Sequence, residues 1–71
     1  MVNIELLREE IKDSGMTVVA IAKKAGIDRA TFYNRLNGVG EFTASEIVGI
    51  TNALHLNKAD RDRIFLPSSV N

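Results

Sequence analysis

The sequence predicts an all-α fold, a compact bundle of five helices in a single domain. Apolar residues recur at the spacing of a helix, and no run alternates apolar and polar residues for long enough to form a half-buried strand. Cap residues and glycines divide the 71 residues into five such segments. Hydrophobic residues make up 45% of the chain and charged residues 25%, which is usual for a globular domain.

The first helix is expected over residues 3–14. Ile4, Leu7 and Ile11 fall on one side of it and form an apolar stripe. Gly15 follows, and glycine readily takes the left-handed conformation that closes many helices. This segment is therefore expected to pack one face on the core.

Two short helices are expected next, over residues 18–25 and 29–37. Thr17 and Asp28 precede them, and side-chain oxygens of these types accept hydrogen bonds from first-turn N–H groups. Gly26 lies between the two helices, where a tight turn needs a residue with a permissive backbone. The pattern predicts two helices joined by a short, sharp turn.

The fourth helix has the clearest start, because Thr43-Ala44-Ser45-Glu46 matches a capping box. Ile47, Ile50 and Leu54 give its buried stripe. Gly49 lies inside this helix, where glycine costs on the order of 1 kcal/mol relative to alanine. A close contact with another helix at Gly49 is therefore expected.

A fifth helix is expected after Asn57, ending near Leu66. Residues 1–66 are thus predicted to form one domain. Residues 67–71 are predicted to be a frayed C-terminal tail, because chain ends without packing partners are seldom ordered.

The residue content argues against several function classes. There is no cysteine, and one histidine cannot form a metal site alone, so no metal site is predicted. That histidine, His55, is expected to end the fourth helix. No apolar run approaches the roughly 20 residues of a membrane span, and the first residues do not resemble a secretory signal. Without a nucleophile set or a phosphate-binding loop, we expect no enzyme activity, cofactor or small-molecule substrate. A cytoplasmic location is expected.

Charge is unevenly distributed along the chain, although its net value is zero. A zero net charge does not favour nucleic-acid binding, because domains that bind nucleic acid often have a basic excess. Between residues 15 and 40, however, Lys23, Lys24, Arg29 and Arg35 face one acid, Asp28, giving that segment a charge of +3. The positive segment coincides with the two short helices.

Residues 17–38 read TVVAIAKKAGIDRATFYNRLNG. This stretch resembles the helix-turn-helix of the phage Cro and C1 repressor-like family. The matching elements, in order, are the cap Thr17, Ile21-Ala22, the turn Gly26-Ile27, Arg29, Thr31, Phe32 and the closing Asn37-Gly38. The resemblance extends over residues 7–56 and implies a lambda repressor-like DNA-binding domain.

The resemblance also implies which residues contact DNA. Arg29, Ala30 and Asn34 stand at the family's principal base-reading positions. Arginine bonds guanine O6 and N7, asparagine bonds adenine N6 and N7, and alanine can touch a thymine methyl group. Contacts to phosphate or sugar are expected from Thr17, Tyr33, Arg35, Asn37 and Gly38.

The function implied is a sequence-specific transcriptional regulator that binds double-stranded DNA. A twofold homodimer on a palindromic operator is expected, since one short helix contacts few base pairs. Ile64, Phe65 and Leu66 are consecutive, so one helix face cannot bury all three. They are candidate dimer contacts, or alternatively they cover the bottom of the core. For a phage-encoded protein, the location would be the cytoplasm of the bacterial host.

A second function is also open, that of an antirepressor, which binds a repressor's helix-turn-helix domain and masks its DNA surface. At Val18 the family usually has a polar residue that contacts phosphate, and the loop that carries Glu41 is often basic. Each missing phosphate contact lowers affinity for DNA. The protein-binding surface would comprise Val18, Val19, Arg29 and Tyr33, with the two valines exposed.

Overall fold

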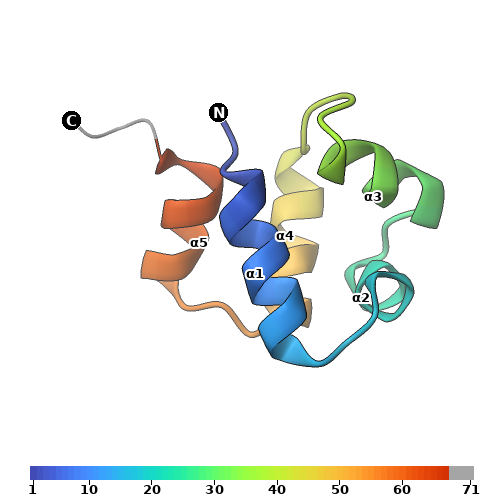
Figure 1. Ribbon diagram of the computed structural model, residues 1–71, viewed down its shortest axis with the longest axis horizontal. Helices are drawn as coiled ribbons and strands as arrows, with labels where there is room; N and C mark the ends of the chain where they lie inside the picture. Colours follow the sequence, from blue (N-terminus) through green and yellow to red (C-terminus); the bar gives the residue numbers. More distant parts are fainter. Residues whose placement is uncertain (68–71) are drawn as a thin grey trace.

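The computed structural model describes residues 1–67 and shows a compact, all-helical fold with no strand in that part of the chain (Figure 1). The prediction of five helices is confirmed, with ends within one or two residues of those expected. The helices are α1 (Ile4–Ser14), α2 (Val18–Ala25), α3 (Arg29–Leu36), α4 (Ala44–Ala53) and α5 (Lys58–Phe65). Residues 68–71, which belong to the predicted frayed tail, lie outside the described residues. None of the described helices is long and apolar enough to cross a membrane.

Each helix starts at a side-chain cap. The cap residues are Asn3, Thr17, Asp28, Thr43 and Asn57, and each accepts a hydrogen bond from a first-turn N–H. The capping box of α4 is complete: Glu46 N–H donates to Thr43 Oγ1 over 3.2 Å, and Thr43 N–H donates to Glu46 Oε1 over 3.0 Å. These local bonds satisfy donors that the helix itself leaves unpaired, which explains why the starts were predictable.

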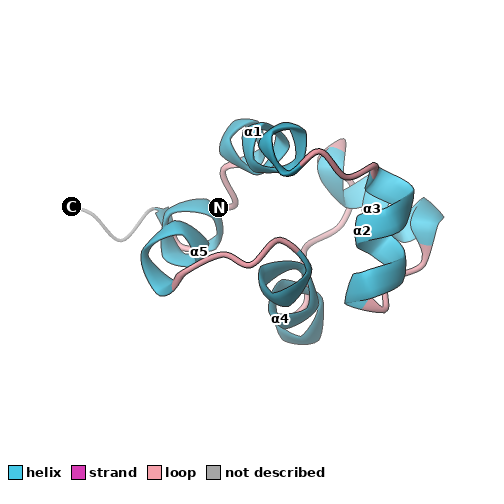
Figure 2. Cartoon of the chain, turned by 90° about the horizontal axis from the view of Figure 1, so that it is seen from below, coloured by secondary structure: helices cyan, strands magenta, loops and turns pink. Residues whose placement is uncertain are grey.

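The helices are arranged around a common centre (Figure 2), where the buried apolar side chains form one core. α2 packs against α4 and α3, and α1 packs against α5. Both views place α2 and α3 at one end of the long axis and α5 at the other. The buried core residues are Leu7, Ile11, Ile21, Ala22, Ile27, Phe32, Leu36, Ile50, Ala53, Ile64 and Phe65.

An aromatic chain links α3 to α5 through the loop before α4. The Phe42 ring meets Phe32 edge to face at a centroid distance of 6.4 Å, and it meets Phe65 in the same way at 5.5 Å. Edge-to-face pairs of this kind add about 0.5–1.5 kcal/mol beyond the burial of their area. Phe42 therefore fixes the loop that follows α3 onto the body of the protein.

The close contact expected at Gly49 is present, and it joins α4 to α2. A Cβ atom at Gly49 would collide with the Ala25 carbonyl oxygen and lie 3.1 Å from Ala25 Cα. Only glycine allows the two backbones to come this close. The contact sets the distance between α2 and α4.

The structure corrects the candidate dimer contacts in α5. Ile64 and Phe65 are buried in the core of the monomer, so they cannot form a surface between two copies. The backbone fixes this orientation, because Asn3 N–H donates to Ile64 O over 2.7 Å and ties the start of α1 to α5. Of the three, only Leu66 has an exposed side chain. The alternative prediction, that this segment covers the bottom of the core, agrees with the burial of Ile64 and Phe65.

Candidate functional site

The two sides of α3 differ sharply in burial. Phe32 and Leu36 lie four residues apart and are buried, which holds one side of the helix on the core. The opposite side is exposed to solvent along its whole length. We call this exposed set the α3 face: Arg29, Ala30, Tyr33, Asn34 and Asn37.

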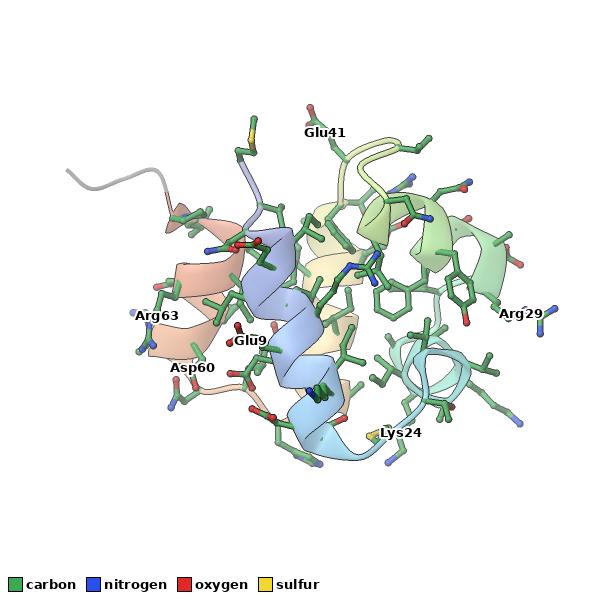
Figure 3. The ribbon with its side chains drawn as sticks, in the orientation of Figure 1. Glu9, Lys24, Arg29, Glu41, Asp60 and Arg63 are labelled. Atoms are coloured by element: carbon green, nitrogen blue, oxygen red, sulfur yellow. The ribbon has the colours of Figure 1, made fainter. Side chains whose placement is uncertain are left out.

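Polar groups of the α3 face are available to an external partner. Within residues 1–67, the side chains of Arg29 and Asn34 make no hydrogen bond or ion pair. Arg29 extends away from the body of the protein at the far end of α3 (Figure 3). A ligand can bond these groups without breaking an internal contact, so only their solvation has to be replaced.

The start of α2, the helix that packs against α3, offers further donors. Thr17 Oγ1 accepts from Ala20 N–H over 3.0 Å, which leaves the hydroxyl proton free to donate. The N–H groups of Val18 and Val19 have no acceptor among the described residues. Free N–H groups at a helix start attract anions such as phosphate, because the helix dipole is positive there.

The two valines at the start of α2 differ in exposure, contrary to the sequence-based expectation that both are exposed. Val18 is half-buried and packs against the core, whereas 44% of Val19 is accessible to solvent. Tyr33 on the α3 face is similarly open, at 45%. The exposed apolar part of the α2–α3 unit is therefore Val19 with the ring of Tyr33.

Arg35 contacts the loop that follows α3. Its side chain is only 19% exposed, its Nε lies 3.3 Å from Glu46 Oε1, and its Nη1 donates to Val39 O over 3.4 Å. The guanidinium fills the space where a Cβ on Gly40 would lie. The structure thus gives Arg35 a role in holding the loop. Glu46, from outside the positive segment, offsets one of its charges and lowers the local excess from +3 to +2.

The N–H groups at the end of α3 are already bonded. Gly38 N–H donates to Arg35 O over 3.1 Å, and Val39 N–H donates to Asn34 O over 2.8 Å. This pair of bonds closes the helix in the manner of a Schellman motif. The backbone N–H of Gly38, expected from the sequence to help hold phosphate, is therefore engaged within the chain.

Arg8 on α1 reaches the same end of α3, which the sequence did not indicate. Its Nη2 donates to Leu36 O and to Asn37 Oδ1, each over 3.1 Å. A cation near the C-terminal end of a helix also interacts favourably with the helix dipole. Because 28 residues separate Arg8 from Leu36, no local pattern in the sequence could reveal this contact.

Comparison of the chain with protein-family models, curated proteins and solved structures found no match. Among residues 1–67 no three side chains are grouped so that they could hold a metal ion. Within these residues the site consists of an exposed helix face with unpaired polar groups and, on the helix that packs against α3, a helix start with free donors.

Proposed function

We propose that the protein is a sequence-specific DNA-binding transcriptional regulator of the phage Cro/repressor type. In this proposal α2 and α3 form a helix-turn-helix, and α3 enters the major groove with its exposed face toward the bases. The observation that supports it most is the α3 face, where Arg29, Ala30 and Asn34 are exposed and the side chains of Arg29 and Asn34 have no partner among residues 1–67. The buried side of the same helix holds that face in a fixed orientation.

The residue types of the α3 face suit base readout. Arg29 can bond O6 and N7 of guanine, Asn34 can bond N6 and N7 of adenine, and Ala30 can touch a thymine methyl group. Five residues of helix separate Arg29 from Asn34, a rise of about 7.5 Å along the axis. That separation lets the two side chains reach different base pairs.

Contacts to the DNA backbone are assigned to neighbouring groups. Phosphate oxygens can accept hydrogen bonds from four groups: the hydroxyl of Thr17, the first N–H groups of α2, the hydroxyl of Tyr33 and the side-chain amide of Asn37. Lys23 and Lys24 are exposed and unpaired within the described residues, and they raise the positive potential at this end of the molecule. A twofold homodimer would place two α3 helices on half-sites about one turn of DNA apart.

Two alanine variants test the proposal. Arg29→Ala and Asn34→Ala should each weaken binding to a selected duplex by about 1–3 kcal/mol, or roughly 5- to 150-fold. The binding constant is measured by mobility shift, and circular dichroism checks the helical fold. Arg63→Ala is the matched control, because Arg63 is an exposed arginine on α5 at the opposite end of the molecule (Figure 3). If both variants bind as tightly as wild type, the proposed readout is wrong.

A second candidate function is binding to the helix-turn-helix domain of a repressor. The observation that favours it is the pair of exposed apolar side chains, Val19 and Tyr33, in a chain with zero net charge. In a pulldown with a purified repressor, Val19→Asp should then weaken capture, whereas Val48→Asp on the exposed side of α4 should not. Val19 is the correct position to change, because an aspartate at the half-buried Val18 would disturb the core. Capture that Val19→Asp leaves unchanged counts against this function.

A further inference from the structure

Asn37 has one amide atom bound inside the protein and one facing outward. A guanidinium has only donors, so the atom of Asn37 that lies 3.1 Å from Arg8 Nη2 must be the oxygen. The amide nitrogen, Nδ2, then carries two N–H groups that have no acceptor among residues 1–67. Asn37 is exposed, so these two donors are directed to the surrounding solvent.

Asn37 offers a side-chain donor at this end of α3, where two neighbouring backbone N–H groups are already used. Because Gly38 and Val39 use their N–H groups to close the helix, neither offers one to an anion. A phosphate that approaches the C-terminal end of the α3 face can therefore be bound by Asn37 Nδ2 but not by these two N–H groups. How strongly Asn37 binds a phosphate depends on whether its Nδ2, and not its Oδ1, already faces the phosphate.

We infer that Arg8 is a positioning residue for phosphate binding, holding Asn37 so that its Nδ2 faces the DNA backbone. The inference rests on the proposed DNA-binding function. An unrestrained asparagine amide can present either its oxygen or its nitrogen, and the oxygen repels phosphate. Arg8 removes that choice, and its second bond, to Leu36 O, fixes the guanidinium itself on α3. Fixing a side chain before binding lowers the entropy that binding has to remove.

The test combines Arg8 and Asn37 substitutions in a double-mutant cycle on a selected duplex. Arg8→Met removes the donors and keeps an unbranched side chain with good helix propensity. Lys12→Met is the control, because it reports the general effect of losing one positive charge from α1. Lys12 lies one turn further along the helix, is exposed, and makes no side-chain bond within the described residues. Asn37→Ala removes the donor that Arg8 is inferred to position.

Arg8→Met is expected to weaken DNA binding about 2- to 10-fold more than Lys12→Met does. That excess should disappear when Asn37 is already alanine. If the excess persists in the Asn37→Ala background, Arg8 touches DNA itself or acts through the fold, and the inference is wrong. It is also wrong if Arg8→Met and Lys12→Met have equal effects.

A measurement on the free protein separates this inference from the proposed function. The side-chain NH₂ resonances of Asn37 should shift in the Arg8→Met variant and stay in place in Lys12→Met, with both variants folded by circular dichroism. Unchanged resonances in Arg8→Met would show that Arg8 does not hold the amide. If instead the resonances shift and wild type binds no duplex, the proposed function fails, and the phosphate role of Arg8 fails with it.

Discussion

His55 adopts a left-handed backbone conformation, with φ of 56°, where α4 ends. Leu56 N–H donates to Thr51 O over 3.0 Å, and His55 N–H donates to Asn52 O over 3.2 Å, so the turn is a Schellman motif. The sequence correctly places His55 at the end of this helix. It does not reveal the positive φ, which costs a non-glycine residue about 1–2 kcal/mol relative to the right-handed form.

Replacing His55 with glycine should stabilise the protein. Because His55 is exposed, the change removes little packing, and it relieves the strained φ. After the larger chain entropy of glycine in the unfolded state is included, the free energy of unfolding should rise by about 0.5–1 kcal/mol. Urea unfolding measures the gain, and Asn52→Gly, at a helical position of the same turn, should instead lower stability. A His55→Gly protein no more stable than wild type would contradict this account of the turn.

The contact between α2 and α4 gives a prediction in which sterics and helix propensity oppose each other. Propensity alone says that Gly49→Ala stabilises α4 by up to about 1 kcal/mol. Because the added methyl group meets the Ala25 carbonyl, we expect a net loss of about 1–3 kcal/mol, the usual range for overpacking. Urea unfolding of Gly49→Ala decides between the gain expected from propensity and the loss expected from overpacking. Val48→Ala is the control, because Val48 is the neighbouring residue of α4 and its side chain is exposed. Increased stability would mean that α2 and α4 can move apart freely.

The helices could be predicted from the sequence because their caps act on residues nearby in the chain. The contacts between helices could not, because they join residues far apart in the chain. Thr17, Asp28 and Thr43 cap helices within three residues of themselves, so sequence spacing alone located those starts. The exposed side of α3 depends on a local signal as well, because the apolar residues Phe32 and Leu36 lie four residues apart and are buried together. By contrast, Arg8 and Arg35 find partners in other elements, which packing alone brings close.

For the candidate site, this difference concerns the internal contacts of two arginines. The family resemblance implied a phosphate contact from Arg35, and nothing in the sequence assigned Arg8 to the site. In the folded protein Arg35 is held by Glu46 and the loop carbonyl of Val39, while Arg8 reaches Asn37 at the end of α3. Burial explains the α5 error in the same way, because hydrophobic sequence does not distinguish a core contact from a dimer contact.

At the scale of the whole molecule, zero net charge conceals an asymmetry that bears on function. Lys23, Lys24 and Arg29 lie on α2 and α3 without internal partners in the described part of the chain, whereas on α5 Arg61 and Arg63 are ion-paired and only Lys58 is not. Interactions between exposed charges are screened within about 10 Å at 0.1 M salt, so local charge outweighs the total. Binding to DNA should therefore occur through the α2–α3 end and weaken as salt rises.

The measurement that tests this account most directly is selection of bound duplexes from a random DNA library at low salt. We predict that wild type enriches a palindromic sequence with half-sites about one helical turn apart, and that the Arg29→Ala, Asn34→Ala double variant loses this enrichment while Arg63→Ala retains it. Adding a cell lysate should leave the consensus unchanged. If wild type enriches no sequence beyond what the double variant enriches, the α3 face does not read DNA and the central claim is contradicted.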